Sequence, residues 1–205
     1  MTWLSDLLAG VARFFNRAAT VGREPAYRVH TWNGHERWSD EDIKKLVAIA
    51  AKYDLNPGDI LLIHLSELGL LYNGSGDPSK WHTPLPGQSA SGMMQWIRST
   101  SASLGVDHDA IMRMGISEQL DVLDKYAARY FAGRGAKTAA DLYMINFIGG
   151  LCKTEACAPK RGTPAYDVNA ALDLDRDGDI DITDLSNKLA KLANRWAAKP
   201  IRDVY

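Results

Sequence analysis

Glu67 is the residue whose surroundings in the sequence most clearly suggest chemistry. It lies near the end of the apolar stretch GDILLIHLSELGL, with Ile63 one helical turn before it and Leu71 one turn after it. An ionised carboxylate among aliphatic side chains is costly, so the Glu67 pKa should rise. A carboxyl that keeps its proton at neutral pH can protonate the leaving oxygen of a glycosidic bond. A partly exposed glutamate at a helix end, or one paired with His64 or an arginine, is the alternative.

The acidic stretch DLDRDGDIDITD, residues 173–184, is a second group of residues that could do chemistry. It has the spacing of an EF-hand calcium loop. Six like charges in twelve residues repel one another strongly without a cation. Only one such loop is present, whereas regulatory EF-hands come in pairs, so the sequence predicts a structural calcium ion rather than a sensor. A solvated acidic turn is the alternative. The expected ligands are Asp173, Asp175, Asp177, Asp179 through its carbonyl, Asp181 through water, and Asp184 where glutamate is usual, with Gly178 at the sharp turn.

Helices are expected to position both groups, because strand signals are weak throughout the chain. Ser39 should cap a helix whose first turn is acidic, and Asn56-Pro57 should start the helix that carries Glu67. A long loop rich in Gly, Ser and Pro spans 72–91, a feature typical of working sites. The sequence therefore predicts a mainly α fold, with further helices at 93–104, 117–131 and 138–148 and one that follows residue 184.

Composition narrows the classes of partner. The chain has 205 residues, of which 46% are hydrophobic and 24% charged, and a net charge of -1 argues against electrostatic binding to nucleic acid. No apolar run is long enough to span a bilayer. Residues 2–17 form an amphipathic stripe expected to dock on the core or on another subunit; contact with a membrane surface is possible but unsupported, because its polar face has few Lys and Arg. Cys152 and Cys157 form either a local disulfide or two free thiols.

The stretch ASGMMQWIRSTSASLGV, which follows Glu67 after the long loop, resembles a motif of the lysozyme-like lytic transglycosylases. In that family a catalytic glutamate ends a helix, and a motif of the form G-L-M-Q-x-x-P-x-T-A-x-x-L-G comes about two dozen residues later. Here the motif begins at Gly92, with Arg98 in place of the proline, and Leu68 stands where the family has serine next to the glutamate. ISEQLDVLDKYAARYF and DLYMINFIGG look like the helix pair that closes the cleft in phage-encoded relatives.

The resemblance implies an activity and a set of site residues. Glu67 would be the catalytic acid and then the base on the 6-hydroxyl of the sugar, cleaving the MurNAc-GlcNAc β-1,4 bond of peptidoglycan without a catalytic cofactor. Gln95, Met94, Tyr143 and Asn146 would contact the substrate, with Gly92 letting the backbone approach the sugar. Trp96 is interpreted as a core residue, with a sugar-stacking platform as the alternative. For Gln95, a helix-capping or backbone-bonding role is the alternative.

The resemblance also implies where the protein works. We expect a lysozyme-like domain at 38–150, preceded by the N-terminal segment 1–37 and followed by a linker and EF-hand-like calcium-binding tail at 151–205. Such a protein would be part of a phage virion, associated with the tail or ejected from it, would contact other virion proteins through its N-terminal helix, and would act on the host cell wall. A hydrolytic lysozyme, with Asp77 or Asp107 as its second carboxylate, and a non-catalytic structural virion component are the competing functions.

Overall fold

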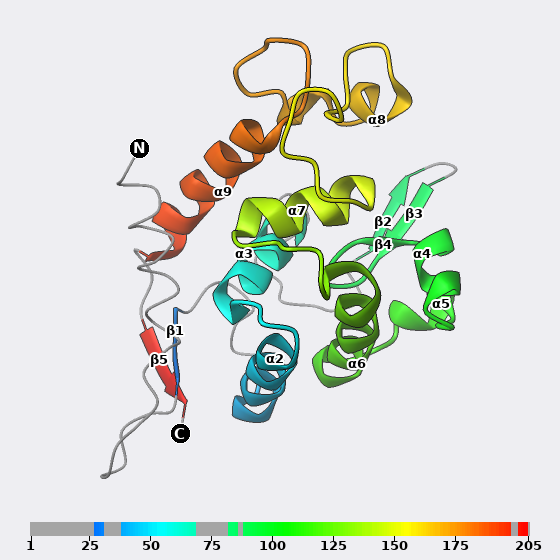
Figure 1. The fold of residues 1–205 in the computed structure, drawn as a ribbon. Helices are drawn as coiled ribbons and strands as arrows, with labels where there is room; N and C mark the ends of the chain where they lie inside the picture. Colours follow the sequence, from blue (N-terminus) through cyan, green and yellow to red (C-terminus); the bar gives the residue numbers. More distant parts are fainter. Residues whose placement is uncertain (1–26, 31–37, 69–81, 86–87, 198–200, 205) are drawn as a thin grey trace.

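The computed structural model describes residues 27–30, 38–68, 82–85, 88–197 and 201–204, and this part of the chain is mainly helical (Figure 1). The expected fold class is therefore confirmed at the level of mainly α, while the lysozyme-like arrangement stays a prediction. The N-terminal helix expected at 2–17 lies outside the described residues. The helices are α2 (Asp40–Lys52), α3 (Pro57–Leu68), α4 (Arg98–Ser103), α5 (His108–Ile111), α6 (Ile116–Tyr126) with its continuation η3 (Ala127–Phe131), α7 (Ala139–Ile148), α8 (Pro164–Asp167), η4 (Ala170–Leu172) and α9 (Ile182–Ala197).

Local capping explains where the first two helices begin. Ser39 caps α2, because its hydroxyl accepts from the Asp42 amide at 3.1 Å while the Asp42 carboxylate accepts from the Ser39 amide at 2.8 Å. Asn56 accepts from the Gly58 amide at 2.9 Å at the start of α3, where Pro57 needs no hydrogen bond of its own. Both starts were expected from the sequence and are confirmed.

Two small antiparallel sheets were not expected. β2 (His82–Leu85) pairs with β3 (Gln88–Ser91), which pairs with β4 (Trp96–Ile97), and β1 (Tyr27–His30) pairs with β5 (Ile201–Val204) near the two ends of the chain. The first sheet occupies part of the stretch interpreted as a long loop. Its strands carry Ser, Thr, Pro and Gln rather than alternating apolar residues, so periodicity gave no signal for them.

The core is built around α3, which contacts α2, α7 and α9 (Figure 1). Ile60, Leu61, Leu62 and Ile63 are all fully buried, as the apolar character of this helix all round its axis predicts. One hydrophobic cluster joins these residues to buried leucines of α9, so the C-terminal segment packs directly on the helix that carries Glu67. Within the described ranges, no helix has the length and apolar character that would let it cross a bilayer.

Candidate functional site

The segment Gly92–Gln95 is the tight turn of the β3–β4 hairpin and not the start of a helix. The Gln95 amide donates to the Gly92 carbonyl at 3.0 Å, and both residues have left-handed backbone, with φ of +78° for Gly92 and +50° for Gln95. Helix α4 therefore begins only at Arg98, which corrects the helix expected at 93–104. Left-handed backbone cannot continue into a right-handed helix, and this explains the later start.

Gly92 is required by packing within the protein. A Cβ placed on it would lie 2.7 Å from Ile111 Cγ2 and 3.0 Å from the Trp96 ring. In the structure, core side chains make the close approach at Gly92, and the approach of its backbone to a sugar stays a prediction. Trp96 is 2% exposed, which confirms its interpretation as a core residue.

Three helices hold the peptide groups of the turn. Gln119 Oε1 of α6 accepts from the Met93 amide at 2.7 Å, and His64 Nδ1 of α3 lies 2.8 Å from the Met93 carbonyl. Asn146 Nδ2 of α7 donates to the Met94 carbonyl at 3.3 Å. The Met93 and Met94 side chains are fully buried, and the Met94 carbonyl shares the Asn146 amide with Glu67. The turn is thus fixed relative to α3, on which Glu67 lies one turn after His64.

Glu67 is brought together with two of the residues predicted from the sequence. Asn146 Nδ2 donates to Glu67 Oε1 at 3.4 Å, and Tyr143 is among the groups that lower the Glu67 pKa. Both partners come from α7, three residues apart and hence on one helical face. Tyr126 of α6 donates to Asn146 Oδ1 at 2.9 Å, which orients the amide so that its Nδ2 faces Glu67.

Burial raises the pKa of Glu67 from 4.5 to about 7, against the opposing effects of Lys188, Tyr143 and Asn146. Glu67 is therefore protonated in an appreciable fraction of molecules at neutral pH, as the apolar spacing predicts. His64 does not supply a charge to it, because burial lowers the His64 pKa to about 4 and leaves the ring neutral. Glu67 is partly accessible to solvent and lies one residue before the end of α3, as the alternative of a partly exposed glutamate at a helix end expected, and the burial that remains still raises its pKa.

Sequence reasoning missed Lys188 of α9, which completes this group. Its Nζ donates to the Tyr143 hydroxyl at 2.6 Å and lies 4.7 Å from the centre of the Tyr143 ring. A signal was present, because Lys188 falls on the apolar stripe of α9 together with Leu185, Leu189 and Leu192. A lysine in that stripe places its charge against neighbouring helices instead of in open solvent.

The remaining residues predicted for the site lie as follows. Gln95 is partly buried and its Nε2 donates to the Gly92 carbonyl at 3.0 Å, which confirms the backbone-bonding alternative; its role toward a substrate stays a prediction. Asp107 is exposed and caps α5 by accepting from the Asp109 amide at 3.0 Å. Asp77 lies outside the described residues. Arg98, found in place of the family's proline, forms an exposed ion pair with Asp109 at 2.6 Å.

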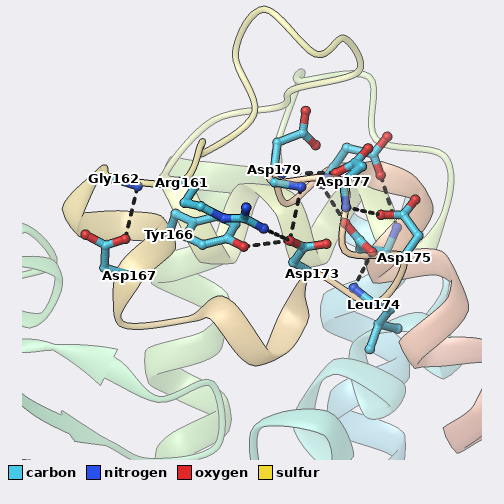
Figure 2. Close-up of polar contacts among 12 residues, drawn as sticks. Arg161, Gly162, Tyr166, Asp167, Asp173, Leu174, Asp175, Asp177 and Asp179 are labelled. Atoms are coloured by element: carbon cyan, nitrogen blue, oxygen red, sulfur yellow. Dashed lines mark hydrogen bonds and ion pairs between the residues drawn. The ribbon is translucent and has the colours of Figure 1, made fainter.

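The acidic stretch 173–184 folds as a compact loop that leads directly into α9 (Figure 2). Its side chains form two groups, each with carboxylate oxygens within 4.8 Å of one another: Asp173, Asp175 and Asp177, and then Asp179, Asp181 and Asp184. The expected ligands are thus brought together, but in two groups of three. Asp184 is 1% exposed, and its two oxygens accept from the Leu174 amide at 2.7 Å and from the Asp181 amide at 3.2 Å, which closes the loop.

Asp173 gives a reason to regard the first group as a cation site. Its Oδ2 accepts from the Tyr166 hydroxyl at 2.6 Å and from the Gly178 amide at 3.2 Å (Figure 2). Its Oδ1 is buried and has no hydrogen-bond partner in the structure, although the residue is only 8% exposed. A buried carboxylate oxygen without a partner is unfavourable, and a hard divalent cation would satisfy it.

Residues 151–163, interpreted as a linker, brace this loop. The Arg161 amide donates to the Gly178 carbonyl at 2.8 Å, and the Ile180 amide donates to the Pro159 carbonyl at 2.9 Å. A disulfide joins Cys152 to Cys157 within the same segment, which decides between the two alternatives for these cysteines. The loop is therefore held by two backbone hydrogen bonds to one adjacent segment, residues 159–161.

Comparisons of the chain with protein-family models, with curated proteins and with solved structures found no match. The likeness to lytic transglycosylases accordingly stays a prediction made from the motif residues.

Proposed function

We propose that the protein is a peptidoglycan lytic transglycosylase with a lysozyme-like fold, in which Glu67 is the single catalytic carboxyl. The observation that carries this proposal is the position of the Glu67 carboxyl, which accepts from Asn146 at 3.4 Å in surroundings whose burial raises its pKa to about 7. A general acid works best when its pKa lies near the working pH, because it can then both give and regain a proton.

The proton movements follow from this arrangement. Protonated Glu67 gives its proton to the oxygen between MurNAc and GlcNAc as that bond breaks, and the N-acetyl group of the substrate stabilises the developing positive charge. Ionised Glu67 then removes the proton from the 6-hydroxyl, which closes a 1,6-anhydro ring and restores the acid. Asn146 and Tyr143 can both donate to the carboxylate, so they stabilise its ionised form between the two steps.

A transglycosylase is favoured over a hydrolase by the groups around the acid. The described groups that shift the Glu67 pKa are an ammonium, a phenol and an amide, from Lys188, Tyr143 and Asn146. A retaining or inverting hydrolase pairs its acid with a second carboxylate, and Asp107 is used as a helix cap.

The acidic loop is proposed to hold a structural Ca²⁺ ion through the carboxylates of Asp173, Asp175 and Asp177. A group of three carboxylates suits calcium better than magnesium, which is usually held by one or two carboxylates and demands a stricter geometry. Titration calorimetry with CaCl₂ and with MgCl₂ tests this, using Asp173→Asn as the variant. Asp54→Asn is the matched control, because the Asp54 side chain is 97% exposed and its left-handed backbone suits asparagine. Equal calcium binding by both variants would contradict the site.

Zymography on purified cell walls tests the enzymatic proposal. Wild-type protein and Glu41→Gln should clear the gel, whereas Glu67→Gln should not; Glu41 is a matched control because its side chain is 81% exposed. Clearing that persists in Glu67→Gln would refute Glu67 as the acid. No clearing by the wild type would favour the structural virion component. Mass spectrometry of the released fragments separates a 1,6-anhydro end from a reducing end.

The place of action is part of the same proposal. We propose that the protein is carried by a phage particle and opens the host cell wall during infection. Immunoblotting of purified virions would test this, and a protein found only in lysed host cells and never in particles would contradict it.

A further inference from the structure

Lys188 connects the site around Glu67 with the acidic loop, residues 173–184. Its ammonium group donates to the Tyr143 hydroxyl at 2.6 Å, and Tyr143 shares a face of α7 with Asn146, whose Nδ2 donates to Glu67 Oε1 at 3.4 Å. An ammonium group only donates, so the Tyr143 oxygen accepts from it and the phenol proton is directed away from Lys188. Lys188 therefore sets which way the Tyr143 hydroxyl is oriented.

Helix α9 delivers Lys188, and the acidic loop fixes the start of α9. Asp184 lies in the first turn of α9 and ties that turn to Leu174 through a 2.7 Å hydrogen bond. Lys188 follows Asp184 by four residues, which is about 6 Å along the helix axis. The same helix packs against both α3 and α7, the helices that carry Glu67 and Tyr143 (Figure 1).

We propose that Lys188 is a positioning residue for the Tyr143–Glu67 pair, and that a divalent cation in the acidic loop keeps it in place by fixing the first turn of α9. Without the cation, mutual repulsion of the six loop carboxylates favours opening of the loop, and the first turn of α9 loses its anchor. This inference deepens the proposed function, because it assigns regulation to the same acid.

Helices α6, α7 and α9 each contribute a group to the electrostatics of Glu67. Helix α7 supplies Tyr143 and the Asn146 amide, α6 supplies Tyr126, and α9 supplies Lys188. Lys188 acts on Glu67 to lower its pKa, while burial lowers the pKa of Lys188 itself. Removing or displacing the ammonium group should therefore move the Glu67 titration to higher pH.

The experiment is an NMR titration of the full chain with ¹³C-labelled glutamate carboxyls, in which the Glu67 signal is assigned by its loss in Glu67→Gln. The midpoint is measured with CaCl₂ or with EGTA in the wild type, Lys188→Met, Lys188→Arg and Lys191→Met. Lys191 is exposed on the same helix and serves as the matched control. The measurement needs no substrate, so it does not depend on the enzymatic proposal.

The expected result is a higher Glu67 midpoint in Lys188→Met, a midpoint close to wild type in Lys188→Arg, and no change in Lys191→Met. EGTA should raise the midpoint in the wild type and in Lys191→Met but not further in Lys188→Met. An unchanged midpoint in Lys188→Met would overturn the role of Lys188. If EGTA lowers the melting temperature of the wild type without moving its midpoint, the control by the cation is overturned, and this arm stands even if Lys188→Met fails to fold.

Cell-wall clearing, measured beside the NMR midpoints, distinguishes failure of this inference from failure of the proposed function. If the protein clears cell walls, the acidic-to-neutral limb of its pH profile should shift upward in Lys188→Met, as the NMR midpoint does. If it clears none while the midpoints behave as expected, the coupling holds and the enzymatic proposal fails.

Discussion

The cost of burying Glu67 should be visible in the stability of the folded protein. Its pKa rises from 4.5 to about 7 on folding, so between these pH values the folded state binds more protons than the unfolded state. The contribution of Glu67 to stability is therefore fully present below pH 4.5 and is lost as the pH rises through about 7. At about 1.4 kcal/mol per pH unit, the loss amounts to about 3 kcal/mol.

Glu67→Gln removes this loss, because the amide keeps the shape of the protonated acid and does not ionise. The free energy of unfolding of the variant minus that of the wild type should increase by about 3 kcal/mol between pH 4 and pH 8, with urea unfolding as the assay. Burial also raises the pKa of Asp59 to about 7, but that group is present in both proteins and cancels in the difference. The gain in stability should accompany the loss of clearing.

Glu41→Gln provides the reference, since an exposed carboxylate should give a difference within about 0.5 kcal/mol at every pH. A difference between Glu67→Gln and wild type that is the same at pH 4 and pH 8 would refute the reasoning, because Glu67 would then titrate alike in the folded and unfolded chain. A difference that falls with pH would show that the carboxylate is stabilised by folding and cannot serve as a proton donor near neutrality.

Three further predictions concern the supports of the site. Gly92→Ala should destabilise the protein by about 1–3 kcal/mol in urea unfolding, because it places a Cβ 2.7 Å from a core side chain at a φ of +78°; a loss under 0.5 kcal/mol would contradict the packing. Replacing Cys152 and Cys157 together by serine should lower the free energy of unfolding by about 2 kcal/mol, because the disulfide restricts the unfolded chain only over a short loop with a sequence separation of 5. Dithiothreitol should lower the stability of the wild type by the same amount and leave the double variant unchanged. Tyr126→Phe should cost about 1 kcal/mol and slow cell-wall clearing, because Asn146 loses the donor that orients its amide; an unchanged clearing rate would show that the amide is held without it.

Short-range spacing in the sequence was enough to predict the fold class, several helix starts and both chemical groups. The side chain of Ser39 bonds within three residues, and Ile63, one of the neighbours expected to raise the Glu67 pKa, lies one turn before it on α3. The acidic loop likewise carries its expected ligands within twelve residues. Such local patterns can be recognised from the sequence, because the contacts they predict form inside one helix or one loop.

The hairpin turn at Gly92–Gln95, the pairing of residues 27–30 with 201–204, and the arrival of Lys188 were decided by tertiary structure. Lys188 and Tyr143 are 45 residues apart, and Asn146 and Glu67 are 79 apart. No local pattern specifies which helix packs against which, so these contacts depend on how α3, α7 and α9 share one core. The sequence by itself thus determined that residue 67 is an acid in apolar surroundings, while only the packing of the helices determined which amide, phenol and ammonium group surround it.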